Sequence, residues 1–238
     1  SSAFEIKYLD KDGQLKNPYQ TSWGTSTRLI GALIMAHGDQ RGLKLPPVVA
    51  PIQVVVVPVA AHKEGVLDKA NEVATALRNA GVRVELDDRE QSPGWKFNEW
   101  EMKGVPVRLE IGPRDIENGQ VVIARRDTHD KFNVKIDDLT TEIPALLDDI
   151  QKNMFKQSHE LLHSHIVTCH TLDEMKEALD NHNFVKTMWC GDRHCEDAIK
   201  EKFAATSRCM PFDQTPVGDV CPVCGRPASH VIYYAKAY

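Results

Sequence analysis

Four cysteines near the end of the sequence stand in two close pairs. Cys190 and Cys195 are separated by four residues in "WCGDRHCED", and Cys221 and Cys224 by two residues in "VCPVCGRP". Four thiolates at such spacings can complete the tetrahedral shell of a zinc ion and leave no position open for water. The pairs therefore predict a structural zinc site whose occupation is coupled to folding. Buried thiols or a redox pair are the alternatives, although the proline and glycine around the second pair favour a tight turn over a thioredoxin-like helix start.

A permanent positive charge stands at an unfavourable position earlier in the chain. In "TSTRLIGALIMAHGD", residues 25–27 supply hydroxyl groups typical of a helix start, and residues 29–36 are apolar all round, which predicts a helix buried on several sides. Arg28 would lie in the first turn of this helix, where the helix dipole disfavours a cation by roughly 0.3–1 kcal/mol. From the residues alone, the simpler interpretation is an arginine paired with a carboxylate elsewhere in the fold.

The segment after Pro47 has the pattern of a small α/β domain. "IQVVVVPVA" predicts a strand buried on both faces, and "KEGVLDKANEVATALRNAG" predicts a helix with Leu67, Ala70, Ala74 and Leu77 on its apolar face. Further strands are predicted for "VRVELDD", "VPVRLEIG" and "QVVIARRD", a short helix for "WKFNEWEMKG", and a long charged helix for "IPALLDDIQKNMFKQSHELLHSH". Strand–helix–strand order predicts an α/β fold with a largely parallel or mixed sheet.

The last part of the chain, from about residue 166, predicts a second and smaller α/β unit. Its helices are expected in "TLDEMKEALDN" and "CEDAIKEKFAA", and its strands in "FVKTMWC" and "SHVIYYAKAY". A unit of fewer than about a hundred residues buries little core unaided, so a structural staple is expected, which the cysteine pairs would supply.

Composition and charge set the broad class. With 238 residues, 42% hydrophobic and 26% charged, the chain is typical of a globular protein of one to three domains. No apolar run reaches the roughly 20 residues of a membrane span, and no signal peptide opens the chain, which predicts a cytoplasmic protein. The net charge of -5 argues against a general polyanion binder but permits a local basic face. The opening residue is not Met, which indicates a fragment or processed product.

Two cysteines stand outside the close pairs. Cys169 and Cys209 are interpreted as small buried side chains.

Beyond these patterns, the sequence resembles the C-terminal half of the prolyl-tRNA synthetases, class II enzymes, of the archaeal/eukaryotic type. "SWGTSTRLIGALIMAHGDQRGLKLPP" is similar to their motif 3, "SPGWKFNEWEMKGVPVRLEIGPRD" to their anticodon-binding domain, and the cysteine pairs with "YYAKAY" to their zinc domain. The resemblance runs from about Tyr19 to the end. It implies the end of a catalytic domain at 1–47, an α/β anticodon-binding domain with a mixed, mostly parallel sheet at 48–145, and a small α/β zinc domain at 146–238.

The resemblance also implies a role for the cation at the helix start. Arg28 would be a catalytic residue that binds ATP, lying against the adenine and reaching toward the γ-phosphate. Backbone N–H groups and a guanidinium would then converge on phosphate charge. Ser26 would contact ATP, and Gly24 would line the proline pocket.

Three further residues would read the anticodon of tRNA-Pro, which carries two adjacent guanines: Glu101, Arg108 and Arg114. A carboxylate can accept from guanine N1–H and N2–H2, and an arginine can donate to O6 and N7. Arg108 is expected on the strand face opposite Val107 and Leu109, and Arg114 in a loop. The alternative for each is a surface ion pair.

The helix that carries Glu101 also carries aromatic and basic side chains. Trp95, Phe97 and Trp100 suit stacking on bases, but a short helix needs apolar anchors, which favours a place in the core. Lys96 is one of the basic side chains that could contact the RNA phosphates in a sequence-independent way.

Taken together, the resemblance implies part of a proline–tRNA ligase. The parent enzyme would activate proline with ATP and Mg, transfer it to tRNA-Pro and act as a homodimer, and its zinc would be structural. Motifs 1 and 2 would lie upstream, so this polypeptide alone is expected to be inactive. The alternative is a non-catalytic tRNA-binding module derived from a class II synthetase. For the carboxylate of Tyr238, a place near the catalytic site and simple aromatic packing are both open.

Overall fold

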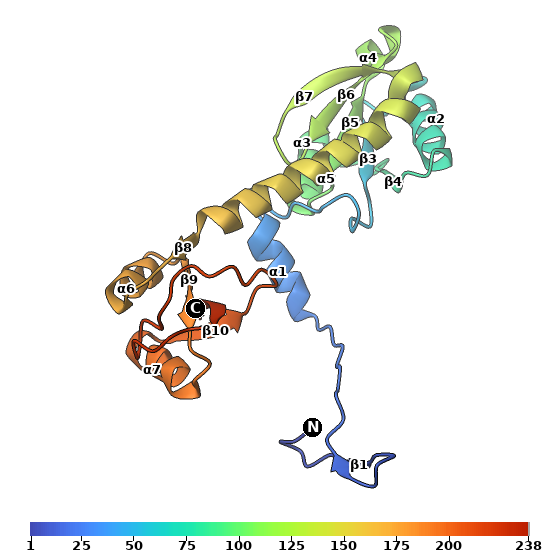
Figure 1. Cartoon of the computed structure of the whole chain (residues 1–238). Coiled ribbons are helices and arrows are strands. Elements are labelled where there is room, and N and C mark those ends of the chain that lie inside the picture. The colour runs from blue at the N-terminus through green and yellow to red at the C-terminus, as the bar shows by residue number, and fades with distance from the viewer. Residues whose placement is uncertain (238) are drawn as a thin grey trace.

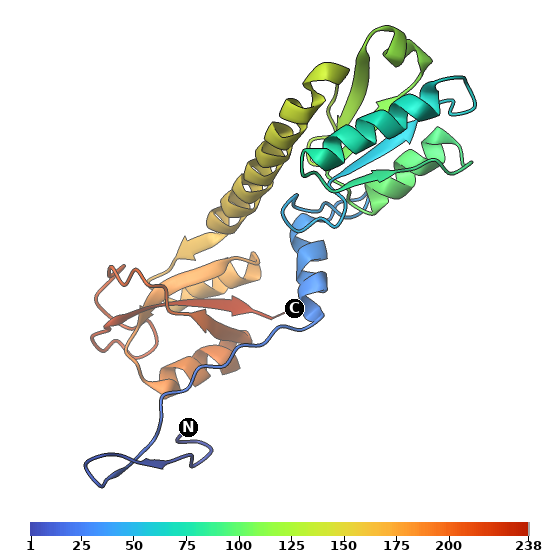
Figure 2. The ribbon, with the colours of Figure 1, turned by 90° about the vertical axis from the view of Figure 1, so that its right-hand side faces the viewer.

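Two α/β units at opposite ends of a long helix make up most of the molecule. The structure, a computed structural model, describes residues 1–237, so the prediction for Tyr238 lies outside the described residues. Helix α5 (Leu139–Ser164) joins the units, and helix α1 (Arg28–His37) lies between them (Figures 1 and 2). The first residues extend away from both units and carry the short antiparallel strands β1 (Tyr8–Leu9) and β2 (Leu15–Lys16).

The first unit is built on a five-stranded mixed sheet in the order β4-β3-β5-β6-β7. The strands are β3 (Val54–Pro58), β4 (Val84–Leu86), β5 (Val107–Ile111), β6 (Gln120–Arg125) and β7 (Lys131–Lys135). Strand β3 pairs in parallel with β4 and β5, whereas β6 pairs antiparallel with β5 and β7. The predicted α/β class and mixed sheet are confirmed, but the sheet is not mostly parallel: two of its pairs are parallel and two antiparallel, because β5, β6 and β7 follow one another through short connections.

Helices cover both faces of this sheet. They are α2 (Val66–Asn79), α3 (Pro93–Met102), the short α4 (Pro113–Glu117) and α5, which follows a 3-10 turn at Ile136–Asp138. Val54 and Val56 of β3 join the core beneath α2 and α5, while Val55 and Val57 pack with Trp100 of α3. The prediction of a strand buried on both faces is therefore confirmed.

The apolar face of α2 differs from the predicted one by a single position. Ala70, Ala74 and Leu77 are buried as expected, but Leu67 is exposed and Val66 is buried. The helix begins at Val66, and its first turn points that side chain toward the sheet.

The second unit has a four-stranded sheet in the order β10-β11-β9-β8. Its elements are β8 (Ile166–Thr168), α6 (Leu172–Asp180), β9 (Phe184–Trp189), α7 (Arg193–Phe203), β10 (Ala205–Cys209) and β11 (His230–Lys236). Strands β8 and β9 are parallel, and the other pairs are antiparallel. Met175 of α6, Ile199 of α7 and Tyr234 of β11 belong to its core. The four elements predicted here are present, and β8 and β10 are additional.

Helix α1 forms where it was predicted but is not buried. Leu29, Ile30, Ile34 and Met35 are between 51% and 72% exposed, and the helix has no buried residue. The prediction of a helix buried on several sides is therefore wrong for the described residues. The physical reason is that α1 packs mainly against α5, so most of its apolar surface remains uncovered by the described residues. Among the described helices, none has the length and apolar character needed to cross a membrane.

Candidate functional site

The start of α1 presents the residues predicted for ATP and proline. Ser26 Oγ accepts from the backbone N–H of Arg28 at 3.3 Å, one residue before the N-cap Thr27, which makes no side-chain capping bond. The side chain of Arg28 is exposed, and within residues 1–237 no carboxylate lies at ion-pair distance from it. Gly24 is exposed, with no atom within 4 Å of a Cβ built on it. The three residues share an open end of the helix, and the predicted alternative of a paired arginine is not seen.

Glu101 and Arg108 line one small cavity at an edge of the first unit. Glu101 lies in the last turn of α3 and Arg108 is the second residue of β5. The cavity has a volume of about 60 Å³ and also includes five basic side chains: Arg41, Arg125, Arg126, His129 and Lys131. The structure thus brings together two of the three residues predicted to read the anticodon.

Cationic and imidazole groups surround the carboxylate of Glu101. Arg41 Nη1 lies 3.0 Å from Glu101 Oε1, and His129 Nδ1 lies 3.6 Å from the same oxygen. Arg126 Nε donates to the backbone carbonyl of Glu101 at 2.9 Å. The side chain of Glu101 remains 22% exposed, so a ligand can reach it.

Arg108 is held between a carboxylate and an aromatic ring. Its Nη2 lies 2.9 Å from Glu110 Oε1, and its guanidinium lies 4.3 Å from the centre of the Phe97 ring. It therefore points to the α3 side of the sheet, away from the buried Val107 and Leu109 as predicted. The predicted alternative of an ion pair is present for Glu101 and Arg108 in this structure.

Arg114 lies apart from this cavity. It was predicted in a loop but belongs to the short helix α4, where it is exposed, beyond the far end of β5 from Arg108. Pro113 begins that helix, and Asp115 accepts from the Gly112 N–H at 2.8 Å. Proline followed two residues later by aspartate is a helix-start signal that could have predicted α4.

The remaining side chains of α3 divide between core and surface. Trp100 is buried and Phe97 is half-buried, but Trp95 is 48% exposed, so its predicted place in the core is wrong. Lys96 is buried: its Nζ donates to the Asp87 carbonyl at 2.9 Å and lies 3.6 Å from Asp87 Oδ1. Because its charge is already paired inside the protein, Lys96 does not serve as a phosphate contact.

The four paired cysteines converge at one end of the second unit. Cys190 follows β9, Cys195 lies in the first turn of α7, and Cys221 and Cys224 lie in the loop before β11. Their sulfur atoms all lie within 4.8 Å of one another, and Cys190 Sγ lies 3.7 Å from the sulfurs of Cys195 and Cys224. A tetrahedral shell with Zn–S bonds of about 2.3 Å has sulfur–sulfur edges of about 3.8 Å. The donor set and its spacing therefore fit zinc.

Arg226 supports this cluster from outside. Its Nε lies 3.3 Å from Cys224 Sγ and its Nη2 lies 3.8 Å from Cys190 Sγ, while the same Nη2 pairs with Asp192. These bonds lower the pKa of the Cys224 thiol to about 6. Burial, together with the neighbouring sulfurs, raises the pKa of Cys195 to about 12. Four thiolates around Zn²⁺ would carry a net charge of minus two, which the Arg226 guanidinium would partly offset.

The two remaining cysteines lie outside the cluster. Cys169 is buried, as predicted, and burial raises the pKa of its thiol to about 11. Cys209 lies on β10 and is exposed, so its prediction as a buried side chain is wrong. The reason is its position near the end of an edge strand, where the burial of β10 falls off.

Comparison with known proteins places these features in a family. A family model described as "Anticodon binding domain" matches residues 53–146, and one described as "Prolyl-tRNA synthetase, C-terminal" matches residues 172–238. The chain is 55% identical over its whole length to proline–tRNA ligases of Clostridium novyi and Lachnospira eligens, and it covers 50% of each. The chain corresponds to the C-terminal half of prolyl-tRNA synthetases. It spans about half the length of the curated relatives it matches, and the predicted family is confirmed.

A solved prolyl-tRNA synthetase shows the same fold. The crystal structure of the Cryptosporidium parvum enzyme, complexed with L-proline and AMP, matches 100% of this chain with a TM-score of 0.90 and 37% identity. This chain covers 51% of that protein.

The sequence patterns did not indicate the residues that join α1 to the first unit. Asp39 accepts from Arg126 through both carboxylate oxygens, at 2.7 and 2.8 Å, and the Arg126 side chain is 4% exposed. The N–H groups of Leu43 and Leu45 donate to the carbonyls of Met102 and Gly104, each at 3.0 Å. Residues 39 and 126 are 87 positions apart, so no local pattern could have indicated their pairing.

Proposed function

We propose that this chain is the C-terminal half of a proline–tRNA ligase, which activates proline with ATP and Mg and transfers it to tRNA-Pro. The observation that carries the proposal is the basic cavity in which Glu101 and Arg108 meet, within the matched anticodon-binding domain. The names of the relatives and the L-proline and AMP bound by the Cryptosporidium parvum enzyme support the same reaction. We expect the complete protein to act in the cytoplasm as a homodimer.

In the parent enzyme, the exposed end of α1 would form one wall of the catalytic site. Arg28 and Ser26 would bind ATP, and Gly24 would leave room for proline. The uncovered apolar sides of α1 support this role, because a helix with four exposed large apolar side chains fits against further protein. The helix start and the unpaired guanidinium would together bind phosphate charge.

The first unit would read the two guanines of the anticodon. The carboxylate of Glu101 would accept from guanine N1–H and N2–H2, and the guanidinium of Arg108 would donate to O6 and N7. Arg114, exposed on α4, would contact a neighbouring nucleotide rather than the same base. We propose the division 1–47, 48–145 and 146–238 for the three parts, with α5 continuing across the second boundary.

The four cysteines would hold a structural zinc ion. Zinc would supply a fixed crosslink between the end of β9, the start of α7 and the loop before β11. With all four positions taken by sulfur, it would have no place for a reacting water.

The test of the proposed function is binding of anticodon stem-loop RNA to the full chain. We expect an RNA with both guanines to bind about tenfold or more tightly than one with either replaced by adenine, since a bidentate contact discriminates by about 1–3 kcal/mol. Glu101→Gln should remove most of the preference at one position. Glu85→Gln, at an exposed carboxylate on β4, is the matched control and should keep it. Equal affinity of the unmodified chain for all three RNAs would contradict the proposal.

A further inference from the structure

The carboxylate proposed to read guanine already has a partner from another part of the chain. Arg41 Nη1 donates to Glu101 Oε1 at 3.0 Å, across 60 positions of sequence. Arg41 lies in the loop just after α1, outside the domain that matches the anticodon-binding family model. The pair therefore connects the α1 region directly with the reading residue.

A guanidinium and the Watson–Crick edge of guanine offer a carboxylate the same chemistry. Each presents neighbouring N–H donors in one plane, which suit the two oxygens of a carboxylate. We propose that Arg41 is an intramolecular competitor for guanine at Glu101, and that the base must displace this side chain to bind. This inference rests on the proposed function, because it assumes that Glu101 reads guanine.

The surroundings of Arg41 allow its side chain to leave while its backbone stays. The side chain is 61% exposed, and exposed ion pairs contribute little net free energy, so displacement is inexpensive. The backbone N–H of Arg41 donates to Asp39 Oδ1 at 2.8 Å, and Asp39 is fixed by the buried Arg126. His129 Nδ1 lies 3.5 Å from Arg41 Nη1 and 3.6 Å from Glu101 Oε1, on the same side of the carboxylate.

Competition of this kind has a distinct effect on different bases. Guanine can replace the donors of Arg41, so it gains less affinity than it would at a free carboxylate. Adenine presents an acceptor at N1 and does not replace them, so it leaves the pair intact. A phosphate-binding arginine would instead strengthen the binding of every RNA equally.

The experiment compares Arg41→Ala with the unmodified full chain at one fixed salt concentration, using stem-loops with two guanines or with either guanine replaced by adenine. We expect the affinity for the two-guanine RNA to rise about two- to fivefold, and the affinity for the RNA altered at the Glu101 position to stay equal or fall. Lys176→Ala, which removes an exposed and similarly paired cation from the second unit, should change neither affinity. If Arg41→Ala lowers the affinity for all three RNAs equally, the inference is overturned and Arg41 is identified as a phosphate contact.

A double-mutant cycle separates this inference from the proposed function. In a Glu101→Gln background, Arg41→Ala should give no gain in affinity, because the contested carboxylate is gone. If Glu101→Gln alone leaves the guanine preference intact, the proposed reading is wrong. If Glu101→Gln abolishes the preference but Arg41→Ala does not tighten binding, the competition is wrong and the reading stands.

Discussion

Asp87 is a buried carboxylate that organises the residues around α3. Its oxygens accept from Arg89 at 2.8 and 2.9 Å and from Trp100 Nε1 at 2.7 Å, and Lys96 Nζ lies 3.6 Å away. Burial alone would raise the pKa of Asp87, but the hydrogen bonds from Arg89 and Trp100 and the charge of Lys96 hold it well below its usual range. Because Trp100 immediately precedes Glu101, the Asp87 carboxylate helps to fix the direction of the side chain proposed to read guanine.

The depressed pKa of Asp87 predicts loss of stability in acid. A carboxyl whose pKa is lower in the folded state stabilises the fold above its unfolded pKa, near 3.9, and this contribution is lost as the pH falls toward the folded value. We expect Asp87→Asn to lower the free energy of unfolding by about 3 kcal/mol at pH 7, since it leaves the buried charge of Lys96 without its counter-charge. Urea unfolding followed by tryptophan fluorescence at pH 7 and below pH 5 measures both effects.

The matched variant for this prediction is Asp88→Asn. Asp88 is the next residue and is exposed, so its substitution should change stability by less than about 0.5 kcal/mol. Below pH 5, Asp87→Asn should show a shallower decline than the unmodified chain. Parallel profiles of stability against pH for Asp87→Asn and the unmodified chain would contradict the role assigned to the Asp87 carboxylate.

At the scale of elements, the cysteine cluster lies beside the paired ends of β9 and β11, where Trp189 stands opposite His230. It connects the end of β9 and the start of α7 with the loop before β11, and Arg226 reinforces the connection through Asp192, the residue that caps α7. A small sheet with helices α6 and α7 gains from such a crosslink because its own core is limited.

Metal content and metal release test the zinc proposal. We expect about one tightly bound zinc per chain, lost on Cys224→Ser and retained on Cys209→Ser, which alters an exposed thiol outside the cluster. Arg226→Gln should bind zinc but release it to a chelator about tenfold faster, since partners of the ligands typically contribute 10- to 100-fold in affinity. Absence of zinc after gentle purification, or identical release rates, would contradict the corresponding assignment.

The elements that could be predicted from sequence are those whose burial leaves a periodic pattern. The valine run of β3 and the apolar face of α2 were clear because both contribute to the core. Strand β7 was missed although "KFNVK" alternates polar and apolar residues, because the run is short and four of its five residues are exposed. The cysteine site was evident from local spacing, whereas the roles of Glu101 and Arg108 came from family resemblance. The pairing of Arg41 with Glu101 had no signal, because it depends on the folded path between distant residues.

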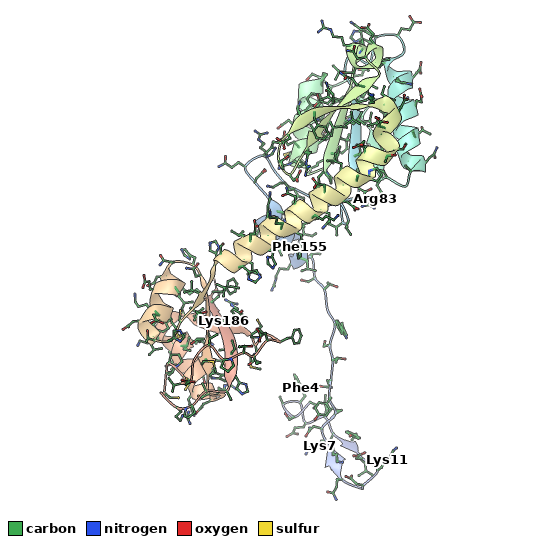
Figure 3. The ribbon with its side chains drawn as sticks, turned by 45° about the horizontal axis from the view of Figure 1, so that its top comes forward. Phe4, Lys7, Lys11, Arg83, Phe155 and Lys186 are labelled. Atoms are coloured by element: carbon green, nitrogen blue, oxygen red, sulfur yellow. The ribbon has the colours of Figure 1, made fainter. Side chains whose placement is uncertain are left out.

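At the scale of the whole molecule, α1 is attached firmly to the first unit and exposes its apolar sides elsewhere. The chain after α1 is held by Arg83, labelled in Figure 3, which immediately precedes the edge strand β4. The Arg83 guanidinium donates to the carbonyls of Pro47 and Ala50 at 2.7 and 2.9 Å. Phe155, also labelled in Figure 3, projects from α5 and is 68% exposed. The exposed apolar residues of α1 and Phe155 of α5 therefore lie in the middle of the molecule, where we propose that the remainder of the parent enzyme packs.

Gly42 lies at a close approach of two backbones at the joint between α1 and the first unit. Its φ is +130°, and a Cβ there would lie 2.5 Å from Met102 Cα. Gly42→Ala should therefore lower the free energy of unfolding by about 2–4 kcal/mol, combining a left-handed backbone cost with a steric clash. Gly119→Ala is the control: its φ is +65° but nothing lies within 4 Å, so only about 1–2 kcal/mol is expected. Equal losses in denaturant unfolding would show that the close approach adds nothing.

The same glycine contact has a consequence for how an RNA would fit. The two backbones are in direct contact there, with no side chain between them that could change its conformation. The distance from the start of α1 to the cavity of Glu101 is therefore fixed. A tRNA bound at its anticodon would place its acceptor end at the catalytic site only if the distance between these two parts of the tRNA matches the distance between the two sites. An RNA with a lengthened or shortened anticodon stem would still bind through its anticodon, but its acceptor end would not reach the catalytic site.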